Sequence, residues 1–99
     1  MTKIKNKTID GDIQTNIKDV KKIYVPSSVF MDLDVTFEFL KNNLPRYYAN
    51  QVLKILPKDK KVDIAYIRRV KTYKILNVHI ITAMYRVAQF HAIQKSETI

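Results

Sequence analysis

The sequence contains no cysteine and only one glycine among its 99 residues. Without cysteine there is no disulfide bond, no thiolate metal site and no cysteine nucleophile. No apolar run approaches the ~18 residues that a membrane-spanning helix needs, and the N-terminal stretch MTKIKNKTIDGD lacks the apolar core of a signal peptide. We therefore expect a cytoplasmic protein with no membrane partner.

Residue arrangements typical of catalysis or metal binding are also missing. The sequence has no Ser-His-Asp set, no paired carboxylates and no glycine-rich phosphate loop at a recognisable spacing. His79 and His91 would lie ~18 Å apart along one helix, which is too far to bind one metal ion. The run Asp10-Gly11-Asp12 resembles the start of a calcium loop, but the later ligands do not follow. We expect no enzymatic activity, no metal, no cofactor and no small-molecule substrate.

Acidic residues are few compared with basic ones. Nine Asp and Glu oppose 18 Lys and Arg, which gives a net charge of +9. The excess is concentrated between Arg46 and Lys74, where nine basic residues face only Asp59 and Asp63 and leave about seven positive charges. Such a segment favours nucleic acid as its partner. The alternatives are an acidic protein partner, or lysines that only keep the protein soluble.

The remaining composition suits one folded domain with an arm. A hydrophobic content of 46% is enough for a core, and 99 residues suit one domain. Residues 1–16 show no persistent period, and we expect residues 1–33 to form an N-terminal arm that is flexible or partly ordered. Within the arm, apolar residues from Ile13 to Ile23 suit a short helix, whereas KKIYVP suits a strand equally well.

Residues 34–95 are expected to form a helical domain. Asp34 is the predicted N-cap of its first helix, although the alternation in VTFEF also suits a strand. The pair Leu44-Pro45 opens a second helix, because proline is well placed in a first helical turn. Pro57 ends that helix and begins the polar turn PKDKK.

Two more helices follow that turn. The first covers residues 63–72 with Asp63 as its N-cap, and the second begins at the cap residue Asn77. The inward side of the first helix is predicted to consist of Val62, Ile67 and Val70. The inward side of the second is predicted to consist of Ile80, Ile81, Met84, Val87, Ala88 and His91.

The run LPRYYANQVLKIL…VDIAYIRRVKTYKILNVHIITAMYRVA, about residues 44–92, resembles small helix-turn-helix DNA-binding proteins of bacterial phages and mobile elements. Their pattern is a leucine-proline opening, a helix, a turn, a recognition helix with an aromatic-aliphatic-x-x-valine motif, a glycine-lysine turn and an asparagine-capped helix. The resemblance implies a mainly α fold, a small helix-turn-helix domain with a partly extended or flexible N-terminal arm, and a repressor-like transcriptional regulator. The turn PKDKK lacks the usual glycine, and Tyr73 replaces the glycine of the glycine-lysine turn, so we expect another shape there.

This interpretation places the helix over residues 63–72 in the major groove of double-stranded DNA, where its first turn meets base edges. Arg69 suits a two-pronged contact with guanine, and Ile64 and Ala65 suit thymine methyl groups. The predicted base-reading residues are Ile64, Ala65, Tyr66 and Arg69. The predicted phosphate contacts are Arg46, Lys58, Lys60, Lys61, Arg68, Lys71, Tyr73 and Lys74.

A homodimer is expected, because one recognition helix covers a small footprint and two protomers would occupy adjacent half-sites. The dimer surface is predicted either in the last helix or among the apolar residues Val29, Phe30, Phe37 and Phe39.

The six tyrosines leave another function open, because aromatic side chains among cations suit stacking on single-stranded DNA or RNA. Tyr48 and Tyr85 occupy predicted core positions, however. Tyr66 and Tyr73 are predicted to face the surface.

Overall fold

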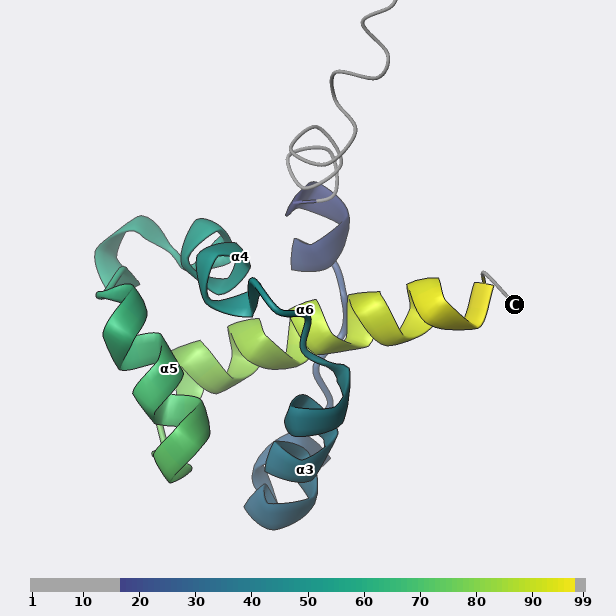
Figure 1. Cartoon of the computed structure of the whole chain (residues 1–99), viewed down its shortest axis with the longest axis horizontal. Helices are drawn as coiled ribbons and strands as arrows, with labels where there is room; N and C mark the ends of the chain where they lie inside the picture. Colours follow the sequence, from purple (N-terminus) through teal and green to yellow (C-terminus); the bar gives the residue numbers. More distant parts are fainter. Residues whose placement is uncertain (1–16, 98–99) are drawn as a thin grey trace, which may run out of the picture.

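Helices dominate the part of the chain that the computed structural model describes, which is residues 17–97, with side chains described from 17 to 94 (Figure 1). Residues 17–21 are helical, and the elements after them are η1 (Ser27–Phe30), α3 (Leu33–Asn43), α4 (Tyr48–Ile55), η2 (Lys58–Lys60), α5 (Ile64–Tyr73) and α6 (Val78–Glu97). No strand occurs between residues 17 and 97. The predicted mainly α class is confirmed, and the strands considered for KKIYVP and VTFEF are excluded.

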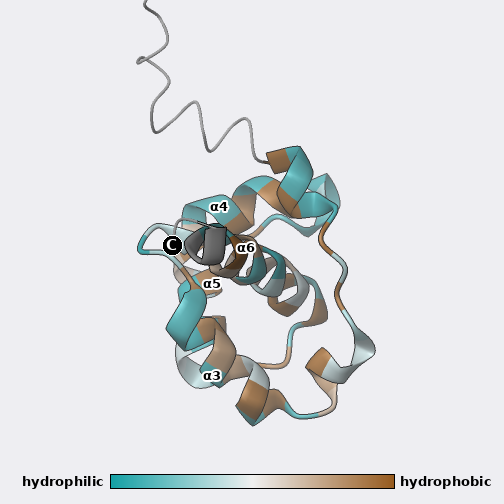
Figure 2. Cartoon of the chain, turned by 90° about the vertical axis from the view of Figure 1, so that its right-hand side faces the viewer, coloured by the Kyte–Doolittle hydropathy of each residue, from teal (hydrophilic) through white to brown (hydrophobic). Residues whose placement is uncertain are grey.

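Helix α6 is the element against which α3, α4 and α5 pack. It crosses the middle of the molecule, with α4 and α3 on opposite sides and α5 beside its N-terminal part (Figure 1). Viewed along α6, the three shorter helices lie around it, and each carries hydrophobic segments (Figure 2). The predicted inward residues of α6 are buried except His91, which is half-buried with its Nε2 3.2 Å from the side-chain oxygen of Gln51 in α4.

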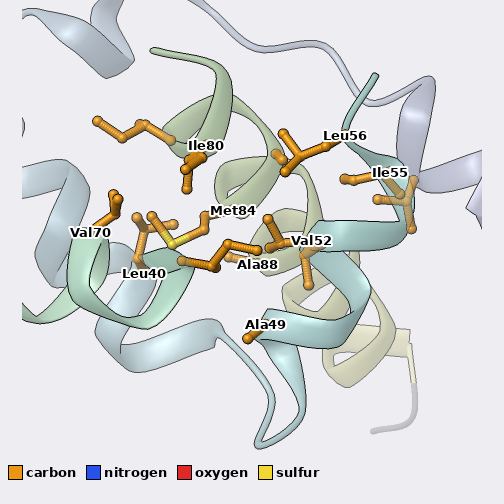
Figure 3. Close-up of a cluster of buried hydrophobic side chains, with 14 of the residues drawn as sticks. Leu40, Ala49, Val52, Ile55, Leu56, Val70, Ile80, Met84 and Ala88 are labelled. Carbon is orange, nitrogen blue, oxygen red and sulfur yellow. The ribbon is translucent and has the colours of Figure 1, made fainter. Parts of the chain in front are cut away.

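One apolar core joins all four helices. Leu40 of α3, Val52 of α4, Val70 of α5 and Met84 of α6 are each 0% exposed. In the close-up, the Met84 side chain lies between Leu40 and Val52 (Figure 3). The unbranched methionine side chain suits the irregular space where several helices meet.

Residues 17–33 contribute to the same core, although we expected them to belong to the N-terminal arm. Val20 and Val29 are buried in it. The buried Thr36 hydroxyl of α3 donates a hydrogen bond to the Val29 carbonyl at 2.6 Å, and Arg86 Nε of α6 donates to the Ile23 carbonyl at 3.0 Å. These bonds connect the segment to both helices. Residues 1–16 of the expected arm lie outside the described residues.

The four residues of the N-terminal half that were proposed for a dimer surface pack in or against the core of the monomer. Val29 and Phe37 are buried, and Phe30 and Phe39 are half-buried against the core. The Phe39 ring centroid lies 5.5 Å from that of Tyr85, which confirms a packing position for this tyrosine. Val29 and Phe37 are therefore not available for the predicted dimer surface, whereas Phe30 and Phe39 keep part of their surface exposed.

The helix starts only partly follow the predicted caps. The Asn77 side chain accepts a hydrogen bond from the Ile80 N–H at 3.1 Å, so its predicted cap of α6 is confirmed. The cap of α3 is Asp32, which accepts from the Val35 N–H at 3.2 Å, and Asp34 lies in the first turn instead. Asp63 occupies the N-cap position of α5, but its side chain makes no capping bond.

Candidate nucleic-acid interface

Helices α4 and α5 pack against each other and are joined by residues 56–63. A helix-turn-helix has a turn of roughly four residues, so this eight-residue connection is longer than the resemblance predicts. Pro57 ends α4 as predicted, because it has no N–H to continue the helix. The Lys61 ammonium then donates a hydrogen bond to the Leu53 carbonyl, which fixes the connection against α4.

Helix α5 has one anchored face and one open face. Ile67 and Val70 are each 0% exposed and point into the core. The residues on the opposite side are exposed, namely Ala65, Arg68, Arg69 and Thr72. At about 100° per residue, Ala65 and Thr72 lie along the centre of the open face, and the two arginines lie on either side of them. The small side chains of Ala65 and Thr72 therefore form a low ridge along the helix, with one arginine on each side of it.

The four predicted base-reading residues divide between these faces. Ala65 and Arg69 are exposed. Ile64 and Tyr66 are half-buried and pack against the core, so the prediction that Tyr66 faces the surface is wrong. Thr72 was missed, although it lies seven residues, or two helical turns, after Ala65. That spacing was the available signal for it.

Tyr66 supports Arg69 on one edge of the open face. The guanidinium carbon of Arg69 lies 5.8 Å from the centroid of the Tyr66 ring. A cation over an aromatic face is attracted by the ring quadrupole, and the planar guanidinium can stack there. The contact restricts the arginine side chain before it meets any partner.

Tyr48 of α4 lies next to the other edge of the open face of α5. Lys71 Nζ lies 5.4 Å from the Tyr48 ring centroid, and the lysine is half-buried between the two helices. Burial raises the pKa of the Tyr48 phenol above its ordinary 10.0, while the positive charge of Arg68 acts in the opposite direction. Arg68 and Lys71 therefore share one aromatic neighbour and form a cationic edge next to α4.

The other predicted phosphate-contacting residues differ in how far the fold uses them. Arg46, Lys58 and Lys60 are exposed. Lys61 is exposed too, but its ammonium binds the Leu53 carbonyl. Lys74 Nζ lies 3.8 Å from the Asp34 carboxylate of α3, the only ion pair between the side chains of residues 17–94.

The charges are unevenly distributed over the fold. The basic residues from Arg46 to Lys71 lie on α4, η2 and α5 or in the segments next to them, whereas three of the six carboxylates described belong to Asp32, Asp34 and Glu38 at the start and in the middle of α3. The lysines of η2 precede the N-terminal end of α5, and Asp34 lies at its C-terminal end through the ion pair with Lys74. Asp59 and Asp63 lie among these lysines, so residues 58–63 carry a net charge of only +1. The larger positive charge lies on α5 itself, at Arg68, Arg69 and Lys71.

The turn after α5 has the left-handed residue one position later than the resemblance predicts. Lys74, with φ 54° and ψ 46°, is the only non-glycine residue with positive φ in the described chain, and Tyr73 is the last helical residue. The N–H groups of Lys74 and Ile75 both bond to the Val70 carbonyl. The Ile75 bond is the 6→1 bond of a Schellman motif, and the Lys74 bond is the 5→1 bond of the simpler αL motif; glycine is the usual left-handed residue in both.

The described part of the chain holds neither a metal-binding cluster nor a membrane-spanning helix. No group of three or more His, Cys, Asp and Glu side chains is placed to hold a metal ion there. None of the described helices is long and apolar enough to cross a membrane. The chain matches no family model, and it has no significant match among curated proteins or solved structures.

Proposed function

We propose that the chain binds double-stranded DNA with sequence preference by inserting the open face of α5 into the major groove. It would act as a transcriptional regulator of the phage or mobile-element type that residues 44–92 resemble. The observation that carries the proposal is the low ridge of Ala65 and Thr72 between Arg68 and Arg69, on a helix held from behind by buried Ile67 and Val70. An α-helix fits the major groove, and small side chains let its backbone approach the base edges.

The two arginines have different roles in this proposal. Arg69, supported by the Tyr66 ring, binds guanine O6 and N7. Arg68 lies on the edge next to α4 and contacts a phosphate together with Lys71. Ala65 contacts a thymine methyl group, and Thr72 replaces the half-buried Ile64 as a base-reading residue.

The charge distribution sets the orientation. The N-terminal end of a recognition helix usually meets base edges, and here that end follows Lys58, Lys60 and Lys61, which outnumber Asp59 and Asp63 in the same segment. The carboxylates of Asp34 and Glu38 would repel phosphates at the other end. The open face of α5 from Ala65 to Thr72 therefore enters the groove, and α3 stays away from the duplex.

A binding experiment with matched charge variants tests this function. The variant Arg68→Ala/Arg69→Ala removes two charges from the open face, and Lys21→Ala/Lys22→Ala removes two charges from exposed residues outside α4 and α5. Fluorescence anisotropy should be measured with duplex DNA, single-stranded DNA, RNA and an acidic peptide. We expect tightest binding to duplex, with a much larger loss in the arginine variant than in the lysine variant.

Sequence preference needs a second measurement. Duplexes selected from a random library should bind the wild type better than random duplex. Arg69→Ala should reduce that preference by about 1–3 kcal/mol. Equal losses in both double variants would contradict the proposal. Tightest binding to single strands, RNA or the acidic peptide would favour the alternative functions.

A further inference from the structure

The corner between α5 and α6, residues 73–78, exposes several apolar side chains. Tyr73, Leu76 and Val78 are 70%, 63% and 52% exposed and lie within six residues. The other corner residues have structural roles, since Ile75 packs against the core and Asn77 caps α6. Isolated exposed apolar residues are common, whereas a group of them indicates a contact surface.

We propose that this corner, defined by Tyr73, Leu76 and Val78, is the surface through which two copies of the chain associate about a two-fold axis. The inference does not depend on DNA binding. The charges around the corner favour a second copy of the chain as its partner.

Local neutrality is the first reason. Two copies of a chain with net charge +9 repel each other at most orientations. At the corner, the charge of Lys74 is compensated by Asp34 at 3.8 Å, and both side chains are largely exposed, at 59% and 90%. On α3, the exposed side chains of Glu38 and Lys41 carry opposite charges and balance each other. A second copy can therefore approach here without the repulsion that the α4–α5 surface would cause.

Self-complementarity is the second reason. A two-fold interface brings the same patch of both copies together, so each must supply what the other needs. Each corner has apolar side chains next to one cation, Lys74, and one anion, Asp34. Rotation about the axis lets Lys74 of each copy meet Asp34 of the other, while Leu76 packs against Leu76 or Val78. An acidic or a basic foreign partner would complement only half of this arrangement.

The position of the corner suits the rest of the molecule. It lies at the C-terminal end of α5, whereas the lysines of η2 precede the N-terminal end. Association at the corner leaves the open faces of both α5 helices accessible, with their N-terminal ends directed away from the axis. The patch is small, so the expected dimer is weak and concentration-dependent in the absence of a ligand.

Sedimentation equilibrium of the full chain without nucleic acid tests the proposal. We expect the average mass to rise with concentration from 11.6 kDa towards twice that value. Leu76→Lys adds a charge to the corner and should weaken association at least about tenfold. The control Ile93→Lys adds the same charge at an exposed apolar position on α6, ~22 Å further along the helix from Val78, and should leave association unchanged.

Far-ultraviolet circular dichroism should verify that each variant folds. If Leu76→Lys does not fold, Val78→Thr keeps a β-branched side chain and should still weaken the dimer. A wild type that stays monomeric up to its solubility limit would overturn the proposal. So would equal weakening by Leu76→Lys and Ile93→Lys, or growth into open chains larger than a dimer. Failure of DNA binding alone would leave this inference standing.

Discussion

The Lys61 ammonium donates a hydrogen bond to the carbonyl oxygen of Leu53. In a continuing helix this oxygen would accept from the N–H four residues later, but that residue is Pro57, which has no N–H. Lysine side chains near a helix C-terminus can bind such open carbonyls. A residue predicted from its charge to contact phosphate therefore also binds an open carbonyl at the C-terminal end of α4 and holds the connection to α5.

Lys61→Met should lower the free energy of unfolding by about 0.5 kcal/mol, the lower end for a hydrogen bond, because this one is exposed. Lys60→Met is the matched control, since it removes the same charge from a neighbouring exposed residue. Urea unfolding measures both. Equal stability of the two variants would show that the bond to Leu53 contributes nothing.

The buried hydroxyl of Thr36 should contribute more. It is 6% exposed and donates to the Val29 carbonyl at 2.6 Å. Thr36→Val keeps the shape but leaves a buried carbonyl without this donor, which should cost about 1–3 kcal/mol. Thr72→Val, at an exposed position, should change stability by less than about 0.5 kcal/mol in the same urea experiment. Similar values for the two valine variants would refute the assigned role of the bond.

The regular parts of the fold were predictable because local patterns determine them. The buried side of α6 and the inward pair Ile67 and Val70 follow from apolar residues spaced three and four apart. Pro57 and Asn77 mark helix ends for reasons that act within one turn. These signals depend on near neighbours, so one sequence is enough to read them.

The remaining features depend on contacts between distant segments. Helix α5 touches α3, α4 and α6, so its flanking residues Ile64 and Tyr66 are half-buried, whereas a helix with one neighbour would expose them. The alternation in VTFEF is compatible with a strand, and it becomes helical because Phe37 and Leu40 reach the core around α6. Asp32 caps α3 in place of Asp34 because the helix begins two residues earlier than the local pattern required.

The left-handed conformation of Lys74 predicts a stabilising substitution. A residue with a Cβ atom pays about 1–2 kcal/mol in this conformation, and glycine does not. Lys74→Gly should therefore be more stable than Lys74→Ala by about 1 kcal/mol. Both variants lose the exposed ion pair with Asp34, so their difference isolates the backbone effect. Thermal or urea unfolding measures it, and a more stable alanine variant would contradict the assigned geometry.

Tyr48 should make stability depend on pH in alkaline solution. Burial raises the pKa of its phenol above 10.0, partly offset by the charge of Arg68. The folded chain therefore keeps the phenol proton to higher pH than the unfolded chain. The contribution to stability is complete below pH 10.0 and is lost as the pH rises through the folded-state pKa.

Urea unfolding below and above pH 10.0 tests this, with Tyr48→Phe as the variant that cannot titrate. Lysines also lose their charge in this range, so the informative quantity is the difference between wild type and variant. Tyr47→Phe, which changes a 63% exposed neighbour, is the control. We expect Tyr48→Phe to lose less stability than the wild type as the pH rises, and Tyr47→Phe to follow the wild type. A Tyr48→Phe curve parallel to the wild type would contradict the burial of this phenol.

The salt dependence of DNA binding should separate phosphate contacts from other lysines. Each neutralised phosphate contributes about −0.9 to the slope of log K against log salt concentration. Lys60 is exposed on η2 beside the N-terminal end of α5, so Lys60→Ala should make the slope shallower by about 0.9 on any duplex sequence. Lys18→Ala removes the same charge from the helical residues 17–21 and should leave the slope unchanged. Because phosphate contacts carry no sequence information, neither variant should alter the preference for selected duplexes. An unchanged slope in Lys60→Ala would place η2 outside the DNA interface.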